Sequence, residues 1–491
     1  MISFILSLAA LIVGYFFYGK VVEKVFGPDS ERPTPAKLKA DGIDFIQMPS
    51  WKVFMIQFLN IAGTGPIFGA IMGAKFGPAS YLWIVLGCIF AGAVHDYLCG
   101  MLSIRNGGVG LPEVVGIYLG KNVKKVMLVF SIILLLLVGT VFVYSPALIL
   151  GDMSGGTQLD IMIWVLVIFL YYIIATLLPI DKVIGKIYPV FAAAMLIMAA
   201  ALAACLFIKW PALPEIWDGL GNRTSAETPI FPCLFITIAC GAISGFHGTQ
   251  SPMMARCLSN EKYGRPVFYG SMITEGIVAL IWAAVSSYFF FDGGAAAVGA
   301  EVTASAPAVV TKVSGSWLGF FGGCLAVLGV VAAPITSGDT AFRSSRLILA
   351  DFFHLDQHPI RNRLFLAIPL FVIAGALLWF NIANEDGFNI IWRYFGWANQ
   401  TLACFTLWAA TVFLYYKKNH GHLLTLIPAC FMTAVCISYI SIAKIGFNLP
   451  SSWSPWIGIA AFCLSFVLWM VLSRAMDKRD NKSASGTDVT Q

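Results

Sequence analysis

Charged residues are scarce in this sequence. Asp, Glu, Lys and Arg make up 11% of its 491 residues, whereas 59% are hydrophobic. The mean hydropathy of +0.82 is too high for a water-soluble domain and is typical of a chain whose helices lie in lipid. This composition leaves no room for a soluble catalytic domain. We expect an all-α polytopic membrane protein that is neither an enzyme nor a binder of nucleic acid.

The sequence lacks a Cys-x-x-Cys pair, although it contains 11 cysteines. Without such pairs, a disulfide scaffold or a zinc site is not expected. The cysteines lie mostly within apolar runs, as Cys88, Cys240, Cys324 and Cys463 do. We therefore predict buried, inert thiols, and we expect no metal and no cofactor.

Thirteen apolar runs are long enough to cross a membrane as helices. They are residues 2–18, 52–73, 80–104, 125–149, 161–180, 187–208, 230–255, 266–291, 316–340, 362–381, 389–416, 422–443 and 454–473. The first run has no basic flank and no small-residue cleavage site, so we interpret it as a retained helix and not as a signal peptide. Basic residues gather in alternate loops, which by the positive-inside rule places the N-terminus outside and the C-terminus in the cytoplasm. We predict disorder for the polar tail from Asp477 onward.

The second and seventh runs are interrupted by glycine, proline and polar residues. The first interruption reads Ala-Gly-Thr-Gly-Pro-Ile from Ala62, and the second reads Ser-Gly-Phe-His-Gly-Thr-Gln-Ser-Pro from Ser244. Lipid cannot satisfy these polar groups, so they must face protein, water or a ligand. We predict that the helices are unwound near Gly63–Pro66 and near Gly245–Gly248. Corresponding broken helices in two halves of a chain indicate the binding site of a secondary transporter.

The two interrupted spans are five positions apart in the order of spans, and the second set of five starts from the opposite side of the membrane. This spacing predicts a five-plus-five inverted repeat. The predicted organisation is a first helix with a cytoplasmic linker (1–50), a first repeat (51–209), a second, inverted repeat (210–418), and two accessory helices with a tail (419–491). The sequence leaves the oligomeric state open.

The start of a half-helix offers backbone N–H groups and a positive dipole, so a carboxylate-bearing small molecule is the favoured substrate. We expect the substrate to contact polar groups at both breaks and two amides in the eleventh run. The candidate substrate-binding residues are Asn60, Gly63, Thr64, Gly65, Ser244, His247, Thr249, Gln250, Asn399 and Gln400.

Ionisable residues inside membrane spans are costly and indicate coupling to an ion. The candidates for proton or sodium coupling are His95, Asp96, Glu275, Thr336, Ser337, Asp339, Thr340 and Arg343, and His247 also titrates. Several alternatives remain open. His95 and Asp96 could be a structural pair, Glu275 could extend to the membrane surface, and Asp339 could pair with Arg343 four residues later. Protons are favoured over sodium as the coupling ion.

Five runs of the sequence resemble the carbon starvation protein A family of bacterial inner-membrane transporters. They begin at Gly65 (Gly-Pro-Ile-Phe-Gly-Ala), Ala93 (Ala-Val-His-Asp-Tyr), Phe246 (Phe-His-Gly-Thr-Gln-Ser-Pro-Met-Met-Ala-Arg), Thr336 (Thr-Ser-Gly-Asp-Thr-Ala-Phe-Arg) and Tyr394 (Tyr-Phe-Gly-Trp-Ala-Asn-Gln). The resemblance covers nearly the whole chain. It implies a LeuT-like fold, a place in the inner membrane, and uptake of peptides during nutrient limitation or of pyruvate with protons. This chain is shorter than the longer members of that family.

Three other classes of function compete with this interpretation. The first is a sodium-coupled symporter of amino acids or organic acids. The second is a metal-ion transporter of the same general fold, which would carry Asp-Pro-Gly-Asn at the first break, where this chain has no acidic residue. The third is an intramembrane hydrolase using Ser244, His247 and Asp96, although the serine lacks a Gly-x-Ser-x-Gly context.

Overall fold

The chain is described here from a computed structural model, which covers residues 1–177, 180–384, 386–417 and 420–486. Within these ranges the regular structure is helical, and the one β-type contact is an isolated bridge between Met48 and Leu258. The predicted all-α class is confirmed. Residues 178–179, at the end of the fifth predicted span, and residues 418–419, at a predicted domain boundary, lie outside the described residues.

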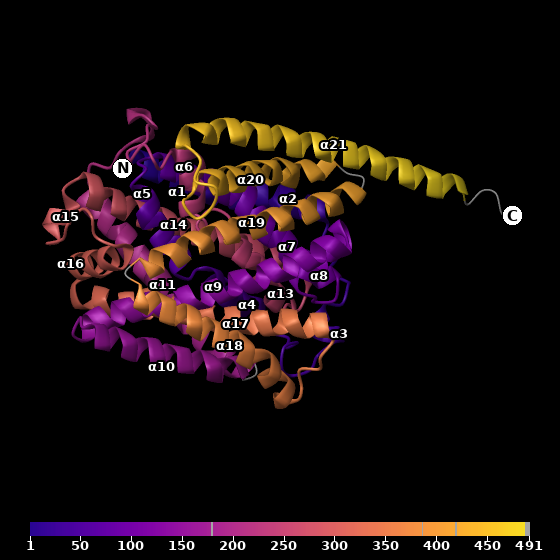
Figure 1. Cartoon of the computed structure of the whole chain (residues 1–491), viewed down its shortest axis with the longest axis horizontal. Coiled ribbons are helices and arrows are strands. Elements are labelled where there is room, and N and C mark those ends of the chain that lie inside the picture. Colours follow the sequence, from indigo (N-terminus) through magenta and orange to yellow (C-terminus); the bar gives the residue numbers. More distant parts are fainter. Residues whose placement is uncertain (178–179, 385, 418–419, 487–491) are drawn as a thin grey trace.

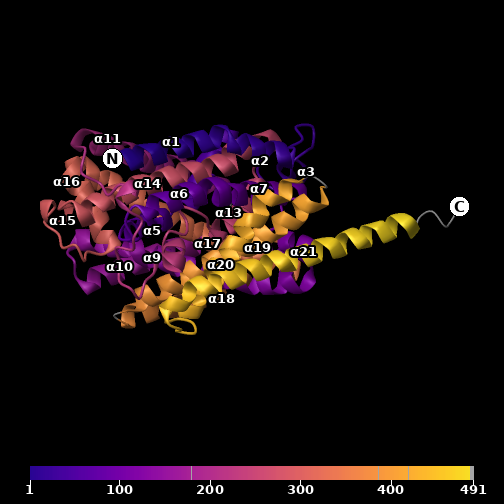
Figure 2. The same cartoon turned by 90° about the horizontal axis from the view of Figure 1, so that it is seen from above.

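The helices lie side by side along the long axis of the molecule (Figure 1). The long ones are α1 (Ile2–Phe16), α9 (Lys121–Ser154), α10 (Gln158–Leu177), α11 (Ile180–Lys209), α14 (Gly270–Phe291), α16 (Ala306–Ala326), α17 (Ala332–Phe353), α18 (Ile360–Ala383), α19 (Gly387–Tyr416), α20 (Leu423–Ile442) and α21 (Ser454–Gly486). Shorter ones are α2 (Tyr18–Phe26), α3 (Pro35–Leu38), α6 (Ala79–Gly87), α7 (Ala93–Arg105), α8 (Leu111–Leu119) and α15 (Gly294–Ala297). The N-terminus and α15 lie at one end of the bundle, and α3 and the C-terminal end of α21 lie at the other (Figures 1 and 2).

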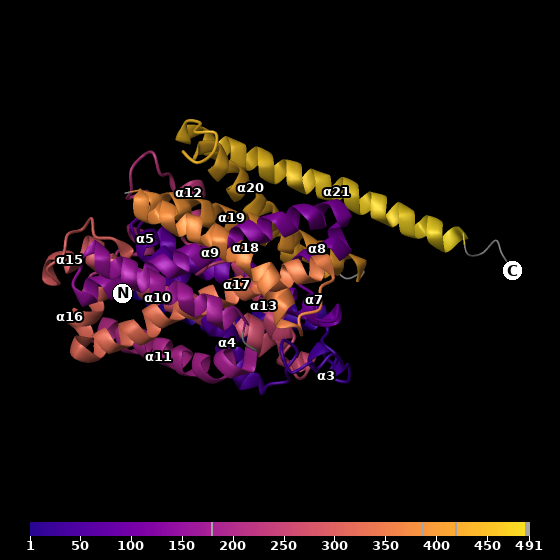
Figure 3. The same cartoon turned by 60° about the horizontal axis from the view of Figure 1, so that its bottom comes forward.

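Burial separates central from peripheral helices. In the span Ala79–Arg105, 83% of the most apolar window is buried, and in Glu261–Phe291 the share is 78%. The corresponding share is 28% in Gln158–Leu177 and 22% in Ser451–Asp477. The α6–α7 segment and α14 therefore form the interior of the bundle. Helices α10 and α21 line its outside, as Figure 3 shows.

Nine helices in the described ranges are long and apolar enough to cross a membrane, and eleven spans result when each of two bent pairs is counted as one. The prediction was thirteen. The two predicted spans outside this set are 230–255 and 389–416. Both are helical, but the first is split into short helices and the second carries the polar residues Arg393, Asn399 and Gln400. The first is absent from the set because its two helices are short and seven residues separate them, and the second because of its polarity.

The first interrupted span consists of α4 (Ser50–Ile61) and α5 (Thr64–Ala74), which meet at an angle of 48°. The helix is unwound only at Ala62 and Gly63. The predicted unwinding at Gly63–Pro66 was therefore placed too late. Proline lacks an N–H and fits the first turn of a helix, where that N–H has no partner, so Pro66 belongs to the start of α5 and not to the gap.

The second interrupted span consists of α12 (Ile230–Thr237) and α13 (Gly245–Ala255), with a non-helical segment at 238–244. The span is broken near the predicted stretch Gly245–Gly248, but the unwound residues directly precede it, because Gly245–Gly248 form the first turn of α13. As at the first break, the glycine-rich run marks the restart of the helix. The gap itself precedes it.

One face of α5 carries glycine at three successive turns and presses against the second break. A Cβ atom on Gly65 would lie 2.4 Å from Cys240 Sγ, and one on Gly69 would lie 2.8 Å from the carbonyl oxygen of Thr237. A Cβ atom on Gly73 would lie 2.2 Å from Ile238. These glycines permit the closest approach of the two interrupted spans, so the two breaks face each other inside the bundle.

Two smaller predictions need correction. The tail after Asp477 is helical to Gly486, where we predicted disorder, and the residues beyond it lie outside the described ranges. The Tyr415 hydroxyl donates to the Asp477 carboxylate, and residues 475–482 include several good helix formers. The 11 cysteines are free, but Cys324 and Cys463 are exposed on the outer surface of the bundle, so not every thiol is buried.

Candidate functional site

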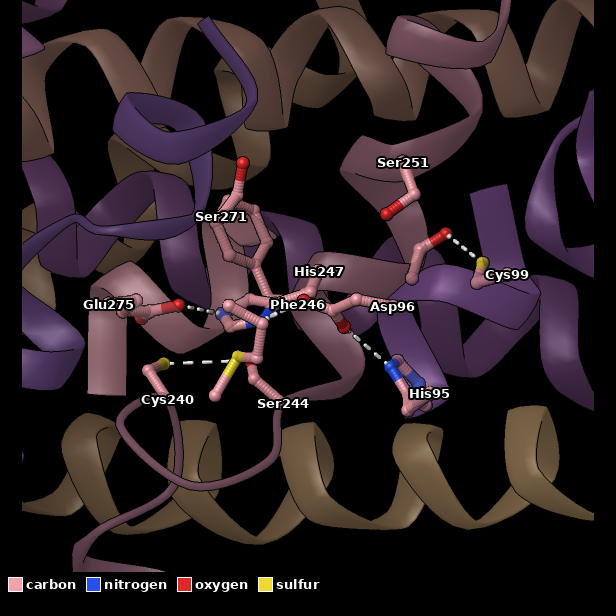
Figure 4. Close-up of polar contacts among 12 residues, drawn as sticks. His95, Asp96, Cys99, Cys240, Ser244, Phe246, His247, Ser251, Ser271 and Glu275 are labelled. Atoms are coloured by element: carbon pink, nitrogen blue, oxygen red, sulfur yellow. Dashed lines mark hydrogen bonds and ion pairs between the residues drawn. The ribbon is translucent and has the colours of Figure 1, made fainter. Parts of the chain in front are cut away.

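Four ionisable side chains form a continuous chain in the interior, beside the second break (Figure 4). Asp96 lies between two histidines. Its Oδ1 is 2.8 Å from His95 Nδ1, and its Oδ2 is 2.9 Å from His247 Nδ1. The other ring nitrogen of His247, Nε2, is 3.4 Å from Glu275 Oε2. All four side chains are fully buried, so the chain crosses from α7 through α13 to α14 without contact with solvent.

The contact between His247 and Glu275 requires a proton. When Asp96 accepts the Nδ1 hydrogen of His247, the Nε2 atom of a neutral imidazole carries only a lone pair. A lone pair facing a carboxylate is repulsive, whereas a proton on either atom turns the contact into an attraction. The pair therefore forms a proton site between two helices, at the start of a half-helix.

The first break places polar side chains that have no partner next to the start of α5. Asn60 and Thr64 are fully buried, and among the described residues neither the amide atoms of Asn60 nor the hydroxyl of Thr64 has a hydrogen-bond partner. Gly63 precedes α5 and provides no side-chain cap, so the first N–H groups of α5 have no side-chain acceptor. Buried orphan groups of this kind are costly and indicate a ligand site.

A hydrogen bond between α4 and α13 brings the two breaks together. Gln57 Nε2 donates to Ser251 Oγ over 3.2 Å, in a contact where both side chains are fully buried. Gln57 lies about one turn before Asn60, and Ser251 lies about one turn after His247. The orphan amide of Asn60 and the proton site at His247 are thus on neighbouring helices, on the same side of this contact.

Side chains from α19 and α6 form hydrogen bonds with the backbone at the second break. Asn399 Oδ1 accepts hydrogen bonds from the Phe246 N–H, at 2.7 Å, and from the Ser244 hydroxyl, at 3.0 Å. Gln400 Nε2 donates to the carbonyl oxygen of Phe235 at 2.9 Å, and Trp83 Nε1 donates to that of Ile238 at 2.9 Å. These side chains replace the backbone bonds lost at the gap. The start of α13 is therefore already capped, in contrast to the start of α5.

The candidates on α17 form a separate group against the first break. Ser337 Oγ donates to the carbonyl oxygens of Leu59 and Ala333, and the Thr336 and Thr340 hydroxyls also donate to backbone carbonyls. Asp339 accepts a hydrogen bond from the Tyr188 hydroxyl at 2.9 Å. Arg343 donates to the carbonyl oxygen of Ala175 at 2.7 Å. Asp339 thus bonds Tyr188, a partner that was not predicted.

The predicted site residues fall into two groups. His95, Asp96, Ser244, His247, Glu275 and Asn399 gather at the second break, and Asn60, Gly63, Thr64, Gly65 and Ser337 gather at the first. Thr249 bonds within α13, and Gln250 Nε2 donates to its hydroxyl. Glu275 is fully buried inside the bundle and its carboxylate faces His247.

Three residues of the site were not predicted. Gln57 had a signal, because it is a polar residue about one turn before Asn60 in an apolar run. No sequence feature distinguished Trp83 and Tyr188, because aromatic residues with one polar atom are common in membrane helices. Ser244, considered as a nucleophile, donates to Asn399, while His247 lies between two carboxylates. No Ser-His-Asp triad is assembled from these three residues.

Comparison with known families gives a match over most of the chain. The model of a family described as "Carbon starvation protein CstA" matches residues 1–149, 151–317 and 309–439. These segments contain both breaks and every residue of the four-membered chain.

Individual relatives agree with this match. A protein of Campylobacter jejuni named "Peptide transporter CstA" is 27% identical over 88% of this chain and 78% of its own length. The Escherichia coli protein of the same name is 25% identical over 90% of this chain and 81% of its own. An "Uncharacterized membrane protein" of Haemophilus influenzae is 45% identical over 59% of this chain and 91% of its own.

Among solved structures, the fold is similar to that of a manganese transporter of Eremococcus coleocola. The TM-score is 0.55, with 10% sequence identity over 88% of this chain and 98% of that one. At this identity the likeness concerns the fold alone. Among the described residues, no group of three or more His, Cys, Asp or Glu side chains is placed to hold a metal ion.

Proposed function

We propose that this chain, which belongs to the carbon starvation protein CstA family, takes up short peptides or small carboxylates such as pyruvate together with protons. The membership confirms the resemblance carried by the five sequence runs, and the chain is a multi-pass membrane transporter. In our proposal the transport is secondary active uptake across the bacterial inner membrane, and it serves the cell during carbon starvation.

The observation that carries the proposal is the proton site between His247 and Glu275 at the second break. With both histidines neutral and both carboxylates ionised, the four-membered chain has a net charge of −2. Such a charge, buried where no solvent reaches, repels an anionic substrate, and each bound proton reduces that repulsion. Protonation therefore favours binding of a carboxylate, which is the thermodynamic requirement for symport.

The substrate carboxylate fits best at the start of α5. The N–H groups there have no side-chain cap, the dipole of α5 is positive at this end, and the orphan groups of Asn60 and Thr64 lie beside it. The start of α13 is less suitable, because Asn399 already occupies it. We assign the Gly63 break to the carboxylate and the His247 break to the proton.

The membrane potential also favours coupling to a cation. Bringing one negative charge inward against an inside-negative potential costs roughly 2.3 kcal/mol per 100 mV, and a proton carried with it cancels that term. The hydroxyls of Thr336, Ser337 and Thr340 donate to backbone carbonyls, and one of them binds the Leu59 carbonyl at the first break. A donating hydroxyl keeps its lone pairs for a cation, so the preference for protons rests on the His247–Glu275 pair and not on these hydroxyls.

Uptake into proteoliposomes tests the proposal. Labelled pyruvate and dialanine are offered with an imposed proton gradient, an imposed sodium gradient, or neither. We expect accumulation with the proton gradient alone, and loss of accumulation in His247→Ala. Accumulation driven by sodium without a pH difference, and abolished by Ser337→Ala, would instead support a sodium-coupled symporter of amino acids or organic acids.

A further inference from the structure

A cavity lies apart from the two breaks, at the end of the bundle that holds the N-terminus. Its volume is about 780 Å³, within the range of small-molecule sites. It is partly open to the surface and is lined by Glu227 and Thr228, the N-terminal parts of α12 and α19, the end of α20 and the segment 443–452. The segment 210–229 precedes the cavity residues in the chain. Its Glu215 carboxylate accepts hydrogen bonds from the backbone N–H groups of Ile2 and Ser3, so this segment lies at the same end of the bundle as the N-terminus.

The walls of the cavity are held in place by hydrogen bonds. The Leu449 N–H donates to the Ser441 carbonyl at 2.9 Å, and the Asn448 N–H donates to the Ala443 carbonyl at 3.3 Å. The Ser451 hydroxyl donates across the cavity mouth to the Ala226 carbonyl at 3.2 Å. The cavity is therefore preformed and does not need to be organised by a ligand.

The charges facing the cavity favour an anion. Arg393 and Lys444 supply two cations, and Glu227 is the one carboxylate among the lining residues. Arg393 is bound by Asp386 at 3.3 Å, but their side chains are 39% and 57% exposed. Exposed ion pairs of this kind contribute little to stability, so a carboxylate of a ligand can compete for the guanidinium group. Tyr439, half-buried, contributes a phenol to the same cavity.

Two helices that line the cavity also contribute to the second break. Arg393 precedes Gln400 by about two turns of α19, and Gln400 binds the Phe235 carbonyl at the edge of the break. Cys233, which lines the cavity, is in the same helix as Phe235. Helices α12 and α19 thus both line the cavity and contribute residues to the second break.

We propose that this cavity is an outer capture site for the carboxylate group of the substrate, with Arg393 and Lys444 as the carboxylate-binding residues. The identity of the substrate rests on the proposed function, but binding at the cavity does not require that transport occurs. Captured molecules are concentrated at the outer end of α12 and α19 before they reach the breaks. For a peptide, Glu227 binds the free amino group.

Binding is tested on the purified full-length protein by protection of a new thiol. The Ser452→Cys variant, combined with His247→Ala to disable the inner site, is labelled with a charged maleimide, and the His247→Ala protein with its native cysteines gives the background. We expect dialanine and pyruvate to slow labelling, whereas dialanine amide, which has no carboxylate, does not. Adding Arg393→Gln and Lys444→Gln should remove the protection, and Lys312→Gln, an exposed cation on α16, should not. Equal labelling with and without dialanine and pyruvate would overturn the proposal, whatever the result of the uptake assay.

Kinetics separate capture from a structural salt bridge. Under capture, Arg393→Gln raises the apparent KM by roughly tenfold or more while the maximal rate is kept. Asp386→Asn, which frees Arg393, lowers the apparent KM. If the ion pair were only structural, both variants would impair uptake in the same direction, and that outcome contradicts the proposal. Glu227→Gln separates the two ligands, because it should weaken dialanine binding and leave pyruvate binding unchanged.

Discussion

Asp96 binds the imidazole of His247, 151 residues further along the chain, across 2.9 Å. The bond fixes the ring so that its other nitrogen points at Glu275. A carboxylate on a continuous helix thereby orients a histidine on a broken one. This relation makes the protonation of the His247–Glu275 pair sensitive to any movement of α13 relative to α7 and α14.

Replacing Glu275 by glutamine imitates a permanently protonated side chain. We expect Glu275→Gln to retain exchange of labelled for unlabelled substrate, but to lose accumulation driven by a pH gradient, because no proton is released on the inner side. Uptake and the internal pH of proteoliposomes, followed together, measure this.

The matched control is Glu113→Gln, which removes a partly exposed carboxylate on α8 that binds Lys124. It should keep proton-driven accumulation. If Glu275→Gln still acidified the vesicles as substrate entered, the proton would be carried elsewhere.

Asn399 supports the second break more than any other predicted residue. Asn399→Leu leaves the Phe246 N–H and the Ser244 hydroxyl without an acceptor, and each buried orphan group typically costs about 1–3 kcal/mol. Thermal unfolding in detergent should occur several degrees lower. Asn399→Asp keeps an acceptor for both donors, so it should unfold at a higher temperature than Asn399→Leu, but below wild type because its charge is buried.

Asn389→Leu is the comparison for Asn399, since its amide binds only Asp386 at the exposed start of the same helix. If the unfolding temperature of Asn389→Leu fell as far as that of Asn399→Leu, the hydrogen bond to Phe246 would not account for the loss of stability.

The contact between α5 and the second break should not tolerate a side chain at Gly65. A methyl group there would lie 2.4 Å from Cys240 Sγ and 2.8 Å from its Cβ, too close for either atom. We expect Gly65→Ala to lower uptake by at least tenfold, a factor that corresponds to about 1.4 kcal/mol. Adding Cys240→Gly should restore part of the activity.

Gly315→Ala provides the control, because an added Cβ there would contact nothing within 4 Å. Normal uptake in Gly65→Ala would mean that the two spans separate during transport far more than their packing suggests.

The pH dependence of stability can be predicted at Glu215, which lies in a loop outside the spans. Burial alone would raise the pKa of Glu215, but hydrogen bonds from the amino group of Met1 and from Ser3 and Ile2 outweigh it and lower the pKa to about 2. The folded pKa is below the usual value of about 4.3, so the carboxylate stabilises the fold above that pH and loses its effect as the pH falls toward 2.

Glu215→Gln should therefore reduce stability at pH 7, by about 1 kcal/mol or less because solvent screens the group, and the difference from wild type should decrease below about pH 4 and vanish only near pH 2. Unfolding temperatures across this range measure the effect. Glu301→Gln, an exposed carboxylate near α15, should show no such difference, and a constant deficit of Glu215→Gln at every pH would contradict the assignment.

The sequence was sufficient to predict the all-α class, the family and the two interrupted spans, because glycine, proline and polar residues stand out in apolar runs. It was not sufficient to place the gaps. Glycine and proline mark where a half-helix begins again, so Thr64–Pro66 and Gly245–Gly248 are helical and the unwound residues precede them.

The hydrogen-bond partners of the polar residues could not be predicted from the sequence either. His247 was predicted as a site residue, but its position between Asp96 and Glu275 depends on how three helices pack. Asn399 and Gln400 were predicted as cavity amides, whereas they replace backbone hydrogen bonds at the second break. A single sequence shows which side chains are costly in lipid, but it does not show which of their neighbours relieve that cost.

The length of helix α21 allows us to predict how deeply the molecule lies in the membrane. Its 33 residues extend about 50 Å, but the apolar stretch from Ser454 to Ser473 measures about 30 Å, the thickness of the hydrocarbon core. Ser454 is fixed to the bundle by a hydrogen bond to the Phe231 carbonyl at 3.0 Å. We therefore expect Ser454 to lie at the level of one membrane surface and Arg474 at the level of the other. The segment 443–452 directly precedes Ser454. If the cavity cations lie at the level of the lipid headgroups, anionic lipids should compete with the substrate for Lys444, and we expect added anionic lipid to weaken the protection of the thiol in Ser452→Cys.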